Sequence, residues 1–201
     1  IENSSSENVI GYLPGSTRPD ESIVYTAHWD HLGRNDAVAG EDHIYNGAID
    51  NATGVAGGGQ VDIQSSAGVS MLGLSRIIAD SDAGAAGQVL VAAVGDVLMQ
   101  GDISASSKNT NGGSVGLLST TGNLLVFGTV SAVGANNGGA VLMSAANGGL
   151  GIGGFVSASG GAGNGGQVTG VADTVILTED SEVAADGGLG AGGLVGFRGT
   201  A

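Results

Sequence analysis

The chain has 201 residues, enough for one domain or for a large and a small one, and 41 of them are glycine. Glycine does not recur at every third residue and only two prolines are present, which excludes collagen, while a hydrophobic content of 41% argues against disorder throughout. The net charge of -14 leaves no basic surface for nucleic acid, and no apolar run approaches the ~20 residues that span a bilayer, so we expect neither a nucleic-acid partner nor a membrane span. The chain has no cysteine for disulfides or a thiolate metal site, which fits an extracellular, cell-surface or periplasmic protein.

The first expected elements are two short strands. Residues 8–13 and 22–28 alternate between apolar and polar side chains and are separated by a loop that holds both prolines, so we expect a hairpin. Past the second strand, the period of two places His28 and Asp30 on one face. A neutral imidazole binds zinc, and a nearby carboxylate fixes its tautomer. A further carboxylate, Asp50, follows in a tight turn of small residues.

Three blocks of this segment resemble the two-zinc aminopeptidase family. The blocks are Asn8-Val9-Ile10-Gly11, then Tyr25-Thr26-Ala27-His28-Trp29-Asp30-His31-Leu32-Gly33, then Tyr45-Asn46-Gly47-Ala48-Ile49-Asp50-Asn51-Ala52-Thr53-Gly54-Val55-Ala56. The resemblance implies that His28 binds zinc, that Asp30 supports His28, and that Asp50 bridges two zinc ions. It also implies a peptide substrate and a truncated α/β peptidase fold for this segment.

The later part of the family's pattern is missing. The family continues after the bridging aspartate into a long helix, which the glycines at 57–59 would stop. It then supplies an adjacent Glu-Glu pair, a further acidic ligand and a late histidine, whereas this chain has no Glu-Glu pair and its last histidine is His43. A two-metal hydrolase needs two coordination shells and a base. We therefore expect no hydrolysis by the chain alone, and zinc binding through His28 and Asp50 that is weak or absent.

The composition changes at Gly57-Gly58-Gly59, where we place a boundary between a segment of residues 1–58 and a domain of residues 59–201. All histidines, tyrosines and prolines and the single tryptophan precede this boundary, whereas 33 of the 41 glycines follow it. Beyond it, a glycine, a variable residue and a valine recur in steps of 26–28 residues. The valines of these units are Val61, Val89, Val115, Val141, Val168 and Val195.

Each repeat offers three short apolar segments separated by Gly, Asn, Asp and Ser turns, which is typical of one coil of a β-solenoid. The first five valines should form one inward ladder, and the corners should use Gly and Asn because these residues accept left-handed backbone angles. The repeat resembles the right-handed parallel β-helices of filamentous haemagglutinin-like adhesins and autotransporter passengers. We therefore expect a mainly β fold, a right-handed parallel β-solenoid of about five coils of 26–28 residues, with residues 1–58 as its N-terminal cap.

Three hypotheses for the function stay open. In the first, the chain is a secreted or surface solenoid that acts by display or by adhesion to an unknown surface ligand, and its solenoids associate end to end. In the second, it is a fragment of a zinc aminopeptidase whose remaining ligands lie outside this sequence or on a second chain. In the third, two unrelated sequences were joined artificially. The first residue, Ile1, and a sixth repeat that has only begun at the end of the chain indicate a piece of a longer protein.

Overall fold

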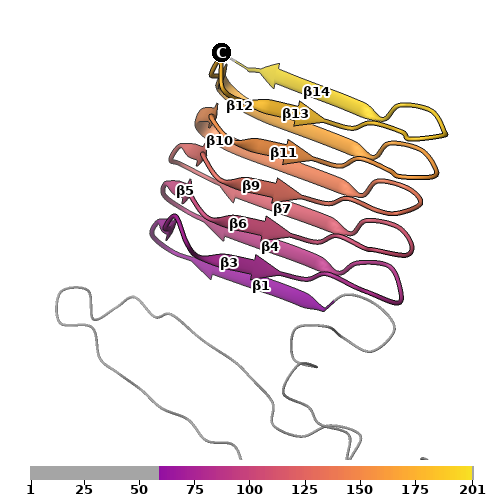
Figure 1. Cartoon of the computed structure of the whole chain (residues 1–201). Helices are drawn as coiled ribbons and strands as arrows, with labels where there is room; N and C mark the ends of the chain where they lie inside the picture. Colours follow the sequence, from indigo (N-terminus) through magenta and orange to yellow (C-terminus); the bar gives the residue numbers. More distant parts are fainter. Residues whose placement is uncertain (1–58, 201) are drawn as a thin grey trace, which may run out of the picture.

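A computed structural model describes residues 59–200, and every regular element in this range is a β-strand. The strands stack into a column of coils (Figure 1). Their bounds are β1 Gln60–Ser65, β2 Val69–Met71, β3 Arg76–Ile78, β4 Gln88–Ala93, β5 Val97–Met99, β6 Asp102–Ser104, β7 Ser114–Ser119, β8 Leu124–Val126, β9 Thr129–Ser131, β10 Ala140–Ile152, β11 Phe155–Ser157, β12 Gln167–Leu177, β13 Glu182–Ala184 and β14 Leu194–Gly199. Between residues 59 and 200 there is no helix long and apolar enough to cross a membrane.

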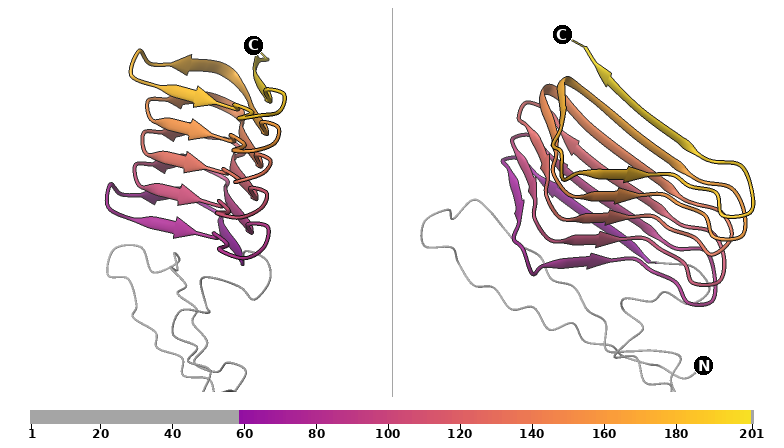
Figure 2. Two further views of the ribbon diagram at one scale, coloured as in Figure 1. Left: turned by 45° about the vertical axis from the view of Figure 1, so that its right-hand side comes forward. Right: turned by 45° about the horizontal axis from the view of Figure 1, so that its top comes forward.

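Each coil runs along three faces of the column (Figure 2). The first face holds β1, β4, β7, the first halves of β10 and β12, and β14, and the second holds β2, β5, β8 and the second halves of β10 and β12. The third face is a separate five-stranded sheet of β3, β6, β9, β11 and β13. All pairings between these strands are parallel. The predicted parallel β-solenoid of about five coils is confirmed, and β14 begins a sixth.

The valines of the Gly-x-Val units form one continuous ladder, as predicted. Each pairs in register with the valine of the next coil, from Val61 in β1 to Val195 in β14. The four inner ones are at most 2% exposed; they are Val89, Val115, Val141 and Val168. Val61 is only partly buried, and Val195 is 43% exposed because no described coil stacks beyond β14.

Two further ladders complete the core from the second and third faces. Val97, Leu124 and Leu150 stack in β5, β8 and β10, and Ile103 and Val130 stack in β6 and β9. All five are at most 1% exposed. Burying such a side chain contributes roughly 1.5–3 kcal/mol, so the stacked apolar interior is the main source of stability.

The expectation of three separate strands in every coil is wrong for the fourth and fifth coils, where the first two segments join into β10 and β12. In the third coil, Ser119 Oγ donates to the carbonyl of Gly95 (2.8 Å) and accepts the N–H of Gly122 (3.1 Å), which turns the backbone at the end of β7. Ala145 occupies the same register in β10 and has no hydroxyl. In the fourth coil the strand continues through the corner, with a register shift against β12 between Ala145 and Gly149. The missing hydroxyl alone does not cause this, because Ala93 at the same register ends β4 in the second coil.

From the third Gly-x-Val unit onward, the glycine is required by close stacking and not by the left-handed backbone predicted for the corners. Neither Gly139 nor Gly166 has a φ in the left-handed region, but a Cβ at either would overlap the carbonyl oxygen of the equivalent glycine of the preceding coil. Each glycine also closes the loop that joins its coil to the preceding one. The N–H of Gly139 donates to the carbonyl of Ala132 (2.8 Å), and that of Gly166 donates to Ala158 (2.7 Å).

Candidate functional site

The three site residues predicted from the sequence, His28, Asp30 and Asp50, lie outside residues 59–200, as do the expected hairpin and the expected cap. Within the described range, no group of three or more His, Cys, Asp or Glu side chains could hold a metal ion. This part of the chain therefore does not fit a zinc centre. The most distinct surface features of these residues are a polar network in the loops of the first three coils and an apolar strip on the second face.

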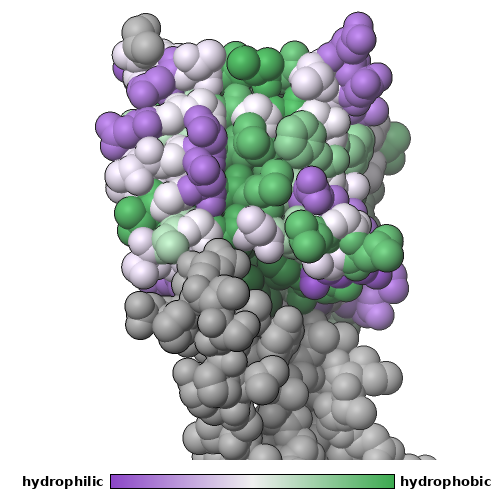
Figure 3. Space-filling view, turned by 90° about the vertical axis from the view of Figure 1, so that its left-hand side faces the viewer, coloured by the Kyte–Doolittle hydropathy of each residue, from purple (hydrophilic) through white to green (hydrophobic). Residues whose placement is uncertain are grey.

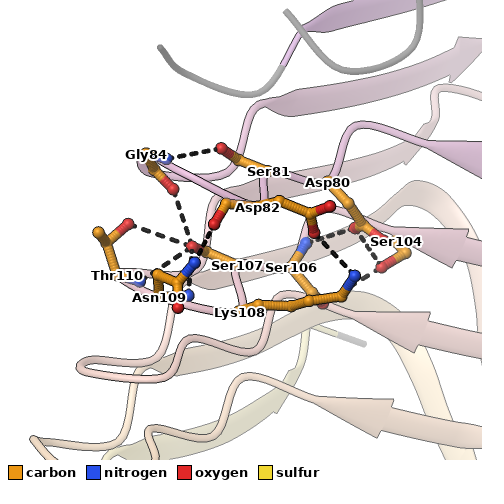
Figure 4. A network of polar contacts seen from close by, with 10 residues as sticks. All are labelled: Asp80, Ser81, Asp82, Gly84, Ser104, Ser106, Ser107, Lys108, Asn109 and Thr110. Carbon is orange, nitrogen blue, oxygen red and sulfur yellow. Dashed lines mark hydrogen bonds and ion pairs between the residues drawn. The ribbon is translucent and has the colours of Figure 1, made fainter. Parts of the chain in front are cut away.

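The polar network centres on Asp80, in the loop that follows β3 (Figure 4). One carboxylate oxygen of Asp80 accepts the Ser104 hydroxyl at 2.5 Å and the backbone N–H of Ser106 at 2.7 Å. The Ser106 hydroxyl lies 2.8 Å from that of Ser131, which carries the network into the third coil. The network thus joins three successive coils where the third face ends.

An exposed ion pair lies beside this network. Lys108 Nζ is 2.8 Å from Asp82 Oδ1, and both side chains face solvent. The hydrogen bond and the charge of Asp82 raise the pKa of Lys108. Ile78 and Val133 form the apolar part of the shallow depression that Asp80, Asp82 and Lys108 border.

The network is not arranged for nucleophilic catalysis. A serine nucleophile needs a neighbouring base that removes its proton and a third group that orients the base. Ser104 donates to Asp80, but residues 59–200 contain no histidine to complete such a set. Ser107 is buried and donates to the carbonyl of Gly84 at 2.8 Å. These hydroxyls form hydrogen bonds between the loops of neighbouring coils.

The sequence predictions missed this network, although a signal for it is present. The polar runs at 80–82 and 106–108 follow Ala79 and Ala105, which are 26 residues apart in the same step as the valines. Residues at equivalent positions of a solenoid stack directly on one another. Consecutive polar runs in register therefore predict hydrogen bonds between coils.

The second face carries the apolar strip. The outward side chains of β5, β8 and β12 are Leu98, Leu125 and Ile176, with Gly151 of β10 between the last two. Ile176 is 59% exposed, and Phe127, just beyond β8, is 50% exposed. Figure 3 shows this apolar surface running along the column between hydrophilic flanks. A continuous exposed apolar surface is typical of a site that binds a protein or another apolar ligand.

Comparison with known proteins concerns the segment that carries the predicted zinc ligands. Residues 8–61 match peptidase family M28. The M28 match covers about a quarter of the chain and ends at Val61, the second residue of β1. No curated protein and no solved structure matches the chain.

The M28 match supports a zinc-peptidase-like segment, because that family is zinc-dependent. It includes His28, Asp30 and Asp50 and stops before the coils that follow β1. The candidate zinc ligands and the solenoid core are therefore carried by different parts of the chain.

Proposed function

We propose that the chain is a secreted or surface-exposed β-solenoid of the adhesin or structural-display type, related to haemagglutinin-like repeats. It carries an incomplete zinc-aminopeptidase segment and does not hydrolyse peptides on its own. Its partner is a ligand on another surface, bound through the side of the column. The segment of residues 1–58 covers the N-terminal coil, where Val61, Ile63, Val69 and Ile77 are only partly buried.

One observation carries this proposal: the repeats after β1 are used for stacking, and the match to a hydrolase ends where the stacking begins. Inward positions form apolar ladders, and the polar loop residues bond from one coil to the next. The outer surface, which includes the apolar strip, is left to bind a partner.

The catalytic half of the proposal is tested by assaying hydrolysis of an aminoacyl anilide by the whole chain with added zinc, beside His28→Ala as the matched control. We expect the two proteins to be equally inactive. Hydrolysis that is present in the parent and lost in His28→Ala would overturn the proposal.

The surface location is tested by brief protease treatment of intact cells that make the protein naturally. Peptides from residues 59–200 should be released while the cells remain intact, since the proposal places the column outside the cell. Complete protection until the cells are broken would contradict the location without bearing on the catalytic half.

A second candidate function is favoured by the M28 match itself: the chain is a fragment of a zinc-dependent aminopeptidase whose missing ligands are supplied by another segment or chain. This candidate predicts that activity appears when the missing piece is added. The first candidate predicts that the chain binds to a surface in the absence of any further peptidase segment.

A further inference from the structure

Four Asn-Gly pairs lie within residues 59–200, and one of them differs from the other three in its hydrogen bonds. Three occupy equivalent positions in the loop after the third face; they are Asn111-Gly112, Asn137-Gly138 and Asn164-Gly165. The fourth, Asn147-Gly148, lies inside β10 at the corner between the first and second faces. Asn-Gly is the dipeptide in which the following backbone nitrogen reaches the asparagine side chain most easily, because glycine has no side chain in the way.

The three loop asparagines form a ladder through their side chains. Asn111 Oδ1 accepts the backbone N–H and the side-chain amide of Asn137, at 3.2 and 2.9 Å. Asn137 Oδ1 accepts the N–H of Asn164 at 3.0 Å, and Asn164 Oδ1 accepts the N–H of Ala191 at 2.9 Å. Each side-chain carbonyl is therefore held in the direction of the next coil.

The glycines that follow these asparagines are held in the same way. The N–H of Gly112 donates to the carbonyl of Asn137 at 3.0 Å, and that of Gly138 donates to Asn164 at 2.9 Å. The N–H of Gly165 donates to the carbonyl of Ala191 at 2.9 Å. In these three pairs, the nitrogen that would attack and the carbon that it would attack are both fixed by bonds to the neighbouring coil.

The side chain of Asn147 lacks the bonds of this ladder. Its side chain is exposed, and within residues 59–200 no group donates a hydrogen bond to its Oδ1, while its Nδ2 donates to the carbonyl of Thr120 at 2.8 Å. It lies in the segment where β10 shifts register against β12, between Ala145 and Gly149. One coil earlier, the N–H of Gly122 is held by the Ser119 hydroxyl, whose place Ala145 takes at this corner.

We propose that Asn147 is a spontaneous deamidation site, and that the asparagine ladder protects the other three pairs. The backbone nitrogen of Gly148 gives up its proton and attacks Cγ of Asn147. The bond from Cγ to Nδ2 then breaks, and the nitrogen leaves as ammonia. Water opens the resulting cyclic imide at either carbonyl, giving aspartate or isoaspartate. In total, one water is consumed and one ammonia is released.

The change alters the contact between two coils. Before the reaction, Asn147 Nδ2 donates to the carbonyl of Thr120. The product has a carboxylate at this position, which has no proton to donate and repels the carbonyl oxygen. The isoaspartate product also lengthens the backbone by one carbon. We therefore expect the corner between the first and second faces to loosen once Asn147 has reacted.

The test is peptide mapping by mass spectrometry after incubation of the folded full chain at mildly alkaline pH. Asn147 should be converted to aspartate or isoaspartate at least about ten times faster than any ladder asparagine, because the ladder pairs react only after local opening. In denaturant, the four pairs should react at similar rates, since only the fold distinguishes them. Equal rates in the folded chain, or a ladder asparagine that reacts before Asn147, would overturn the proposal.

Ala145→Ser gives a matched control, because it restores the hydroxyl that holds the glycine N–H one coil earlier. Deamidation at Asn147 should slow several-fold in this variant and stay unchanged at the three ladder positions. If Ala145→Ser folds as the parent does and Asn147 reacts as fast as before, the assigned cause is wrong. Should the variant not fold, the order of reaction in the parent chain decides the matter alone.

Discussion

The backbone N–H of Gly139 lies 2.8 Å from the carbonyl oxygen of Ala132 and donates to it, and this bond closes the loop between the third and fourth coils. The same pairing of Gly and Ala recurs in each of the five loops, from Gly87 with Ala79 to Gly193 with Ala185. The glycine of the repeated unit is thus held by a bond across the loop that precedes it and, from Gly113 onward, by close stacking on the preceding coil.

Gly139→Ala should lower the free energy of unfolding by about 1–3 kcal/mol, because the new Cβ would overlap the backbone carbonyl of Gly113, which has little freedom to move. Urea unfolding measures the change. Gly192→Ala is the control, since nothing lies within 4 Å of a Cβ at that position, and it should change the stability by less than about 0.5 kcal/mol. Equal effects of the two changes would show that stacking does not require the glycine.

Val141→Asp should destabilise the column by several kcal/mol, about the cost of burying an unpaired polar or charged group. Val141 is 1% exposed and lies between Val115 and Val168 in the inward ladder. Leu142→Asp is the control on the adjacent residue, whose side chain is 46% exposed on the outer surface. A variant at Val141 that melts like the parent would contradict the assignment of the ladder.

Some features of this fold are predicted from the sequence and others are not, depending on the interaction that determines each feature. The valine ladder is predicted from the sequence, since an inward position in each coil must be apolar and the 26–28 residue step fixes the register. The role of the repeated glycines is not predicted, because composition does not distinguish a left-handed corner from a close approach of two backbones. Gly139 is an example of the second.

The corners are harder to predict because their register and hydrogen bonds differ from coil to coil. In the third coil the Ser119 hydroxyl bonds the corner between β7 and β8, whereas the fourth coil runs through its corner as the single strand β10. The polar network around Asp80 was missed as well, although the polar runs that follow Ala79 and Ala105 in register give a signal for it. The predicted site residues His28, Asp30 and Asp50 lie outside the described residues and remain predictions.

Asp80→Ala should cost about 1–3 kcal/mol, because it leaves the Ser104 hydroxyl and the Ser106 N–H without their acceptor in a partly buried loop. Thermal or urea unfolding measures this loss. The matched change, Asp82→Ala, removes only an exposed ion pair and should leave the stability unaltered within error. An unchanged free energy of unfolding in Asp80→Ala would mean that water replaces the carboxylate at no cost in free energy.

The ion pair of Lys108 and Asp82 should persist at neutral pH and be lost at alkaline pH. The pKa of Lys108 is raised in the folded chain, so any stability that the pair contributes is present below the ordinary lysine value of 10.5 and is lost as pH rises through the folded pKa. An NMR titration of the Lys108 side chain checks this. In Asp82→Asn the pKa should fall toward the ordinary value, and an unchanged pKa would contradict the assigned cause.

Zinc binding by residues 1–58 should be weak, because a site with two protein ligands is less well held than one with three or four. His28→Ala and Asp50→Ala should each abolish it, and His43→Ala should leave it intact. Occupancy should fall as pH drops through about 6.5, since His28 must be neutral to bind the metal. Isothermal titration with zinc at several pH values gives both results, and loss of binding in His43→Ala would reassign the ligand.

The number of zinc ions that remain on the dialysed full chain tests most directly whether this molecule is a scaffold with a partial peptidase segment or a working hydrolase. Elemental analysis by mass spectrometry, calibrated to protein concentration, gives that number. We predict well under one zinc per chain, because two protein ligands do not retain the ion through dialysis. Two zinc ions held per chain, the content that a two-metal hydrolase requires, would contradict the account.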